Sequence, residues 1–238
     1  MRLLCINPNT SEAMTGAVVA AVRPCLPPGT DIVAETARFG APAIASRTAF
    51  AVGAHATVAC FAGRAHEPWD AVLLACFGDP AREAMREIAD VPVLGMAEAA
   101  MILAARRHGR FSVVTGGILW ERMLTEFAGA IGLAEQLVSV RTIAATGGDI
   151  FRDPHAARAA LVAAVAQAEG DGASCAILGG AALVGMAAVL RADTTLPLLD
   201  PAVALATLVL ERVADDRRLG LGARPSPKAA ELRAAGWI

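Results

Sequence analysis

The sequence repeats one order of short apolar runs, and each run ends at a turn that precedes an alanine-rich stretch. Three landmarks recur in the same order in each half, at or within these runs: Asn7, Cys76 and Pro92, then Thr115, Gly180 and Pro197. The separations are 69 and 16 residues in the first half, and 65 and 17 in the second. Three ordered elements at matching spacing predict that the chain holds one structural unit twice.

Short apolar runs that alternate with helical stretches indicate parallel sheets covered by helices on both faces. We therefore expect an α/β protein of two pseudo-symmetric halves, with the carboxyl ends of the strands facing a shared cleft where a ligand binds. We place the first half at residues 1–97 and the second at 98–199. Residues 200–238 are expected to pack back on the first half, and 220–238 read as a tail interrupted by glycine and proline.

Several helices have recognisable starts. Thr10 or Ser11 is expected to cap a helix that opens at Glu12. Asp79 followed by Pro80 predicts a capped helix over 81–89. Further helices are expected over the following ranges: 97–107, 120–129 and 203–214.

The charge, the cysteine content and the apolar runs argue against a nucleic-acid-binding, secreted or membrane protein. The 21 basic and 23 acidic residues give a net charge of −2 without a basic block, which argues against nucleic acid as a partner. Five scattered cysteines form no disulfide framework, and the apolar run after Met1 is too short for a secretory signal, so we expect a reduced, cytoplasmic protein. Residues 172–190 lack charges, but Gly179-Gly180 in their middle favours a strand, a turn and a helix start over a membrane span.

Cys76 is the strongest candidate for chemistry. It follows a buried strand (71–75) and precedes the helix start at Asp79-Pro80. A helix N-terminus stabilises a thiolate, so we expect a lowered pKa, and Gly78 lets backbone N–H groups approach a ligand. The other four cysteines are expected to be structural or to carry no functional signal.

Two loops at the same edge complete the candidate site. Asn7, Asn9 and Thr10 offer amides and a hydroxyl beside a helix start, which suits a carbonyl or carboxylate. The matching loop of the second half, Thr115-Gly116-Gly117, offers backbone donors free of large side chains. Phe77 and Trp120 are either the apolar wall of a pocket or core residues. The four histidines have no metal-ligand spacing and no nucleotide fingerprint is present, so we predict no metal and no cofactor.

Three motifs together resemble the hydantoin racemase branch of the aspartate/glutamate racemase superfamily, up to about residue 210. They are Ile6–Ser11, Ala75–Pro80 and Ile177–Ala181. The resemblance implies two flavodoxin-like halves, an active site in the cleft between them, no cofactor, a small-molecule substrate and a homo-oligomer. It also implies substrate contacts from the loops above, together with Phe77, Gly180 and Ala181.

The resemblance further implies a reaction in which two cysteines face each other across an acidic carbon of a hydantoin, an amino acid or a related acid. Cys76 matches the first of them. Gly180 stands in the place of the second, and Cys175 lies five residues earlier, inside the expected strand. No Ser, Thr, His, Asp or Glu lies within three residues of Gly180.

Three interpretations follow. The first is a racemase-type isomerase in which Cys76 is one acid/base and a water or a distant side chain is the other. The second is a one-thiol enzyme similar to arylmalonate decarboxylase, whose single cysteine resembles the second-half position; with the thiol on the opposite face, the mirror-image product is expected. The third is a ligand-binding protein without catalysis.

Overall fold

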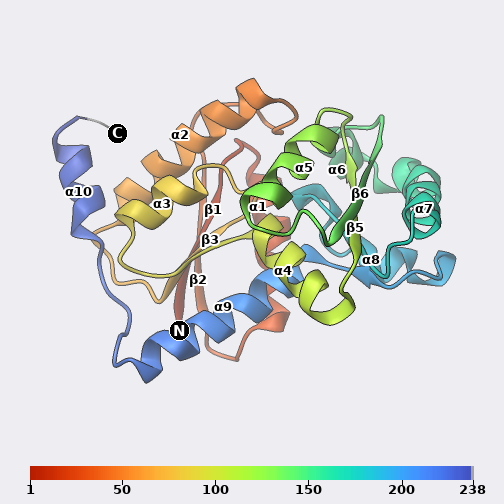
Figure 1. Cartoon of the computed structure of the whole chain (residues 1–238). Helices are drawn as coiled ribbons and strands as arrows, with labels where there is room; N and C mark the ends of the chain where they lie inside the picture. The colour runs from red at the N-terminus through yellow and green to blue at the C-terminus, as the bar shows by residue number, and fades with distance from the viewer. Residues whose placement is uncertain (237–238) are drawn as a thin grey trace.

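A computed structural model describes residues 1–236 and contains two four-stranded parallel sheets (Figure 1). The first sheet has the order β2-β1-β3-β4 and the second has the equivalent order β6-β5-β7-β8. The eight strands are β1 (Arg2–Asn7), β2 (Asp31–Thr36), β3 (Ala71–Leu74), β4 (Val93–Gly95), β5 (Phe111–Gly116), β6 (Leu137–Ile143), β7 (Ala176–Leu178) and β8 (Leu198–Leu199). The predicted repeat and α/β fold are thus confirmed.

The central strands form because their side chains are apolar on both faces. All four residues of β3 are fully buried, and so are Leu3, Leu4 and Ile6 of β1. A strand covered on both sides reads as a continuous apolar run rather than an alternating one. β1 pairs with β3 from Leu3–Ala71 onward, and β5 pairs with β7 from Ser112–Ala176 onward.

Helices cover both faces of each sheet. They are α1 (Glu12–Val22), α2 (Arg47–Arg64), α3 (Arg82–Ile88), α4 (Met96–His108), α5 (Trp120–Ala130), α6 (Gly147–Arg152), α7 (Pro154–Gly170), α8 (Met186–Leu190), α9 (Pro201–Arg218) and α10 (Pro227–Ala234). Ser11 caps α1 by accepting the N–H of Met14, as predicted. No helix in the described residues is both long and apolar enough to span a membrane.

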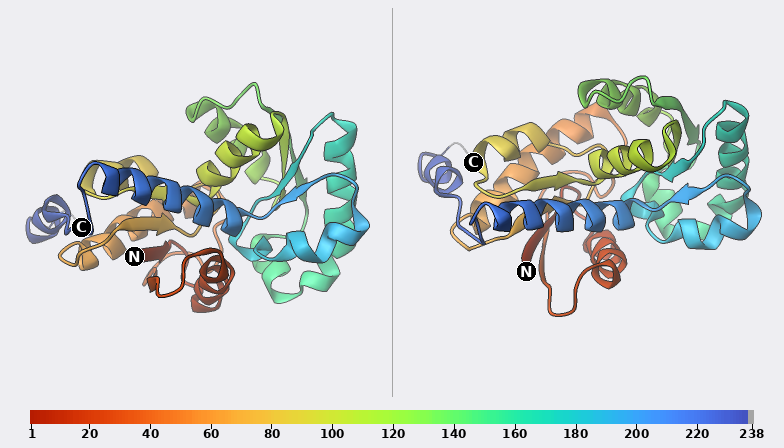
Figure 2. Two further views of the ribbon diagram at one scale, coloured as in Figure 1. Left: turned by 90° about the horizontal axis from the view of Figure 1, so that it is seen from below. Right: turned by 60° about the horizontal axis from the view of Figure 1, so that its bottom comes forward.

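The C-terminal segment crosses from the second sheet to the first. The long helix α9 packs on α4, α1, β3 and β4 (Figure 2). Beyond it, Arg224 exchanges two backbone hydrogen bonds with Trp69, and α10 packs on α2 with Ala229 fully buried. The segment over 224–229 therefore packs on the first half, while most other described residues of the tail are exposed; residues 237–238 lie outside the described range.

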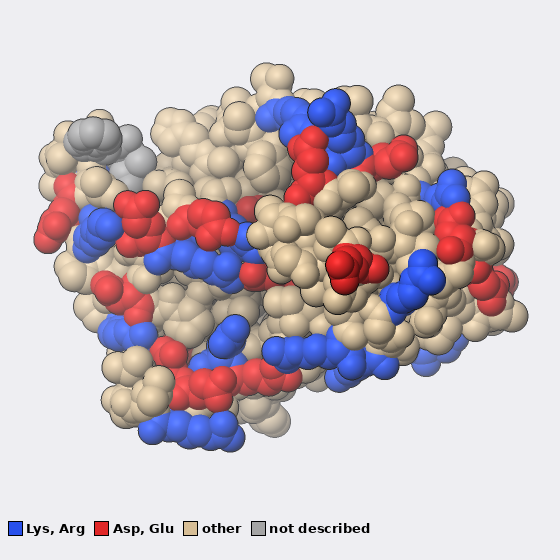
Figure 3. All heavy atoms as spheres, viewed as in Figure 1, with Lys and Arg blue, Asp and Glu red and all other residues tan. Residues whose placement is uncertain are grey.

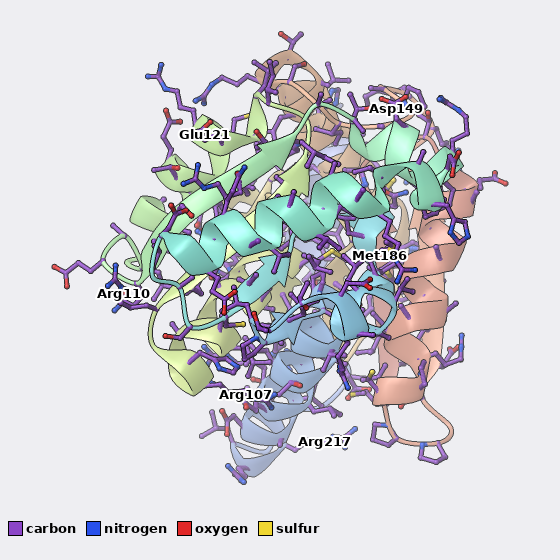
Figure 4. The ribbon with its side chains drawn as sticks, turned by 90° about the vertical axis from the view of Figure 1, so that its right-hand side faces the viewer. Arg107, Arg110, Glu121, Asp149, Met186 and Arg217 are labelled. Atoms are coloured by element: carbon purple, nitrogen blue, oxygen red, sulfur yellow. The ribbon has the colours of Figure 1, made fainter. Side chains whose placement is uncertain are left out.

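Figure 4 shows the second half with the helix α7 lying in front of its sheet. Its outer helix α7 runs between Asp149, on α6 after the carboxyl end of β6, and Arg110, just before β5 begins. These two labelled residues mark the two edges of the sheet, so the carboxyl edge lies at the Asp149 end. Acidic and basic side chains are intermixed on the face in Figure 3, in keeping with the small net charge.

One predicted helix start is wrong. The helix after Cys76 begins at Arg82, and its N-cap position is Ala81 rather than Asp79. Both Asp79 and Ala81 have positive φ angles, of 54° and 66°. The Asp79 carboxylate instead accepts the backbone N–H groups of Ala97 and Glu98, at 2.8 Å each, and so caps α4.

Candidate active site

A small cavity of about 50 Å³ lies between the two halves, at the carboxyl edges of both sheets. The first half contributes Asn9, Met14, Ala43, Ile44, Cys76 and Phe77. The second half contributes Thr115, Gly116, Trp120, Gly147, Ile150, Gly179, Gly180, Ala181, Ala182 and Leu183. Seven of the predicted site residues are therefore brought together here: Cys76, Asn9, Phe77, Thr115, Gly116, Gly180 and Ala181.

Cys76 follows β3 and contributes the cavity's thiol. It is 6% exposed. Burial, and then the nearby Asp79 carboxylate, raise the pKa of this thiol far above its usual value. The expectation of a lowered pKa is wrong, because the N-terminus of α3 begins six residues later and the charge beside the sulfur is negative. The resting side chain is a neutral thiol.

Asn7 holds the first loop in shape rather than facing the cavity. Its Nδ2 donates to Asn9 Oδ1 at 2.8 Å, to the carbonyl of Ser11 at 3.2 Å and to Thr15 Oγ1 at 2.9 Å. The N–H of Thr10 donates to the carbonyl of Ala41, and Thr10 does not line the cavity. Of the three predicted residues, only Asn9 reaches the cavity.

Asn9 keeps donor capacity toward the cavity. Its Oδ1 accepts from Asn7 and from the N–H of Ser11, while its Nδ2 has the thioether of Met14 as its hydrogen-bond acceptor, at 3.6 Å. A thioether is a weak acceptor. The amide N–H₂ of Asn9 is therefore a suitable donor to a substrate carbonyl.

The loop at Thr115-Gly116-Gly117 offers fewer backbone donors to the cavity than predicted. The N–H of Gly117 donates to the carbonyl of Ile143, and Gly117 does not line the cavity. A Cβ at Gly116 would lie 2.4 Å from Ile150 Cδ1 and 2.6 Å from the carbonyl of Ala145. Packing, rather than ligand approach, thus accounts for Gly116, and Thr115 supplies the loop's polar side chain.

The glycine pair after β7 forms the wall opposite Cys76. A Cβ at Gly179 would lie 2.6 Å from Phe77 Cε1 and 2.8 Å from Val113 Cγ1, so Gly179 makes room for Phe77 of the other half. A Cβ at Gly180 would meet nothing closer than Leu183 Cδ1 at 3.6 Å. The site of the absent second thiol is therefore open space.

Phe77, Gly78 and Trp120 close the contact between the halves. Trp120 Nε1 donates to the carbonyl of Ile44 at 3.2 Å. Gly78 does not line the cavity; a Cβ there would lie 2.7 Å from the Trp120 ring. Ala43 and Ile44 were missed in the sequence because they lie in an irregular stretch between β2 and α2 that has no periodic pattern.

The cavity's electrostatics are simple. Within the described residues, no Lys, Arg, His, Asp or Glu lines it, and its polar side chains are those of Asn9, Cys76 and Thr115. The backbone N–H groups of Phe77, Gly78, Gly180 and Ala181 donate to no protein acceptor in the described chain. No three His, Cys, Asp or Glu residues among those described gather as metal ligands. The arrangement suits proton transfer to and from a neutral molecule, with N–H donors for a developing oxyanion.

Comparisons with known proteins agree with this geometry. The family model for Asp/Glu/Hydantoin racemase matches residues 3–209. A hydantoin racemase from Paenarthrobacter aurescens is 33% identical over 203 residues, covering 84% of this chain and 86% of the relative. The solved allantoin racemase from Pseudomonas fluorescens has a TM-score of 0.84 at 29% identity, covering 97% of this chain and 96% of that one. An arylmalonate decarboxylase, 17% identical with a TM-score of 0.59 over 95% and 96% of the chains, shares the fold. The chain therefore belongs to the Asp/Glu/hydantoin racemase family and is an enzyme of the racemase or isomerase type.

Proposed function

We propose that this enzyme moves a proton at the carbon next to a carbonyl of a neutral cyclic amide of the hydantoin type, with Cys76 as the acid/base and without a cofactor. The observation that carries the proposal is the cavity itself, which holds one thiol and no charged side chain among the described residues. The likeness to hydantoin and allantoin racemases supports the same substrate class.

The lack of charge selects among the family's substrates. An amino acid or a malonate brings at least one carboxylate, and a buried charge without a partner is strongly unfavourable. A hydantoin ring is neutral and offers carbonyl and N–H groups. The amide of Asn9 and the free N–H groups of Phe77, Gly180 and Ala181 suit those carbonyls.

The proton balance follows from the thiol. Cys76 first gives its proton to solvent water, which leaves a thiolate; with the substrate bound, the thiolate takes the proton from the carbon and becomes a thiol again, while the ring carbonyl becomes an enolate oxygen held by N–H donors. Return of the proton from sulfur to the same face restores the starting enantiomer, whereas inversion needs a donor on the other face. Gly180 supplies none, and Thr115 is the hydroxyl side chain that lines the cavity from the second half.

The proposal is tested by hydrogen–deuterium exchange in D₂O at the acidic carbon of both enantiomers of a 5-substituted hydantoin. We expect one enantiomer to exchange faster, mainly with retention, and Cys76→Ala to slow that exchange by about 10²–10⁴-fold. Cys175→Ala is the matched control, because Cys175 is buried in the sheet away from the cavity. Thr115→Val should slow inversion without slowing exchange with retention.

Undiminished exchange in Cys76→Ala would contradict the role of the thiol, and no exchange in the unaltered protein would contradict the substrate class. The glycine at position 180 fits a second candidate reaction, loss of CO₂ from a malonate, which forms an enediolate without a base and needs one proton donor, although the uncharged cavity disfavours the malonate's carboxylates. In that case an arylmalonate given in parallel would release CO₂. The product should then have the handedness opposite to that from arylmalonate decarboxylase.

A further inference from the structure

The segment that follows Cys76 takes a strained path. Gly78 has a φ of 132°, Asp79 of 54° and Ala81 of 66°. Residues other than glycine rarely adopt positive φ, and such conformations persist only where their surroundings hold them. Something outside the segment therefore fixes the backbone between the thiol and α3.

The Asp79 side chain is that constraint. It is 2% exposed, and its two oxygens accept the N–H groups of Ala97 and Glu98 in the first turn of α4. The fit depends on Gly95, where a Cβ would lie 2.0 Å from Asp79 Oδ2. A carboxylate, a glycine and a helix N-terminus from two neighbouring strand ends thus form one joint.

The helix that receives Asp79 is itself anchored in both halves. α4 packs on α9 and β4, and also on β5 and β7 of the second sheet (Figure 1). Its buried residues belong to the apolar core that contains both Cys76 and Phe77. The joint therefore places the thiol relative to the opposite wall of the cavity.

Asp79 also sets the charge near the sulfur. Its own neighbours are Glu98 on α4 and Arg82 on α3, which form an ion pair with each other at 2.6 Å; Glu98 is also paired with Arg86. Burial first, and Glu98 to a lesser extent, raise the pKa of Asp79 to about 7, against the lowering effects of the two N–H groups and Arg82. The Asp79 carboxylate is the charged group that acts on the Cys76 thiol, and it raises the pKa of that thiol.

We propose that Asp79 is the positioning residue of the reacting thiol: its carboxylate fixes Cys76 beside the cavity, and its charge sets how readily the sulfur loses a proton. The inference rests on the proposed role of Cys76. Asp79 does not line the cavity, so it would act on the reaction through Cys76 and not by touching the substrate.

The test is alkylation of Cys76 by iodoacetamide from about pH 5.5 to about pH 9, followed for each cysteine by peptide mass spectrometry, because the thiolate is the reacting form. In the unaltered protein, the logarithm of the rate should rise with pH in two steps. Ionisation of Asp79 near pH 7 makes the sulfur harder to deprotonate, so the slope should fall below one there and then recover.

Two substitutions separate charge from position. Asp79→Asn removes the charge at nearly constant shape, and should give a single straight rise with about tenfold faster alkylation at alkaline pH. Asp79→Glu keeps the charge but is too long for the space at Gly95; it should lower kcat for hydantoin exchange by about tenfold with little change in KM, since the cavity walls are unaltered. Asp200→Asn, directly after β8, is the control that should leave the Cys76 profile unchanged.

A single slope in the unaltered protein, or superimposable profiles for it and Asp79→Asn, would overturn the proposal. If Asp79→Asn does not fold, the two-step curve of the unaltered protein decides alone. The outcome is independent of the proposed reaction: a two-step curve together with full exchange in Cys76→Ala would refute the reaction and leave the control of the thiol standing.

Discussion

The two halves share strand order and direction but differ where it matters for chemistry. β3 ends in a thiol, an aromatic ring and a glycine, whereas β7 ends in two glycines and an alanine. The ring of Phe77 occupies the space that a side chain at Gly179 would need. The wall after β3 thus carries the thiol and the aromatic ring, and the wall after β7 leaves space for them.

Each half also ties its catalytic-edge loop to the next helix with a carboxylate. In the first half, Asp79 reaches from the loop after β3 to the N-terminus of α4. In the second, Asp200 caps α9 by accepting the N–H of Ala202, and reaches back to the N–H of Gly185 after β7. In both cases a carboxylate links the loop after one strand to the start of the helix after the next strand, but Asp79 follows the first strand of the pair and Asp200 follows the second. Asp79 raises the pKa of Cys76, which lines the cavity, whereas Asp200 raises the pKa of Cys25, which does not, so the two joints differ in which thiol they act on.

The largest expected effect comes from moving the thiol to the other wall. Cys76→Gly combined with Gly180→Cys should transfer exchange to the opposite enantiomer, with the original one slowed by about 10²–10⁴-fold. The new side chain has space, since its Cβ would lie 3.6 Å from Leu183, although the φ of 157° requires a small backbone adjustment. The measurement is deuterium incorporation into each enantiomer.

Single variants complete that experiment. Gly180→Cys alone should speed inversion relative to retention, because both faces then carry a thiol. Cys76→Gly alone should lose exchange with both enantiomers. An unchanged preference in the double variant would show that the choice of enantiomer is set by how the ring binds and not by which wall holds the sulfur.

Alanine substitutions at Gly179 and Gly180 should differ in their effect on the free energy of unfolding. Gly179→Ala should lower the free energy of unfolding by about 1–3 kcal/mol, because its Cβ would overlap Phe77 and Val113. Gly180→Ala meets backbone strain without steric overlap, and should cost about 1 kcal/mol, the lower end of that range. Urea unfolding of both variants measures the difference, and equal losses would argue against close contact between Phe77 and the β7 wall.

Most of the sheet could be predicted because its central strands are continuous apolar runs. The two strands without a specific prediction, β2 and β6, lie at sheet edges and are only partly buried. β6 even includes Arg141, which is paired with Asp171. β4 and β8 are edge strands too, but their short sequences are apolar and mostly buried; β2 and β6 are half exposed and so lack the continuous apolar run that identifies a buried strand.

The site was predicted where it depends on strand ends and missed where it depends on distant contacts. Asn9, Cys76 and Gly180 follow strands and Thr115 lies near the end of β5, and the carboxyl edges of these strands meet. Asp79 followed by proline favours a local cap, but its partners are 18 and 19 residues away and the space for it exists because residue 95 is glycine. This contact depends on Asp79, on the first turn of α4 and on Gly95, which are far apart in the sequence, so a local sequence pattern does not predict it.

The smallest expected effect compares the two carboxylate joints through the pH dependence of stability. The pKa of Asp79 is raised to about 7 in the folded chain, above its value in the unfolded chain. The folded state therefore binds more protons between these values, and the contribution of Asp79 to stability is present at low pH and lost as pH rises to about 7. The stability of the unaltered protein minus that of Asp79→Asn should fall by about 2 kcal/mol between pH 5 and pH 8.

Variants of two other aspartates provide comparisons for the pH dependence of stability expected at Asp79. Burial also raises the pKa of Asp200, but no acidic neighbour adds to the rise, so the difference for Asp200→Asn should have the same sign and a smaller size. Thr146 lowers the pKa of the exposed Asp149, whose contribution is lost only as pH falls through that low value, so its difference should be flat over the same range. Urea unfolding at several pH values measures all three. A flat difference for Asp79→Asn would mean that the Asp79 carboxylate stays ionised throughout, and the two joints would then differ only in which strand end supplies the acid.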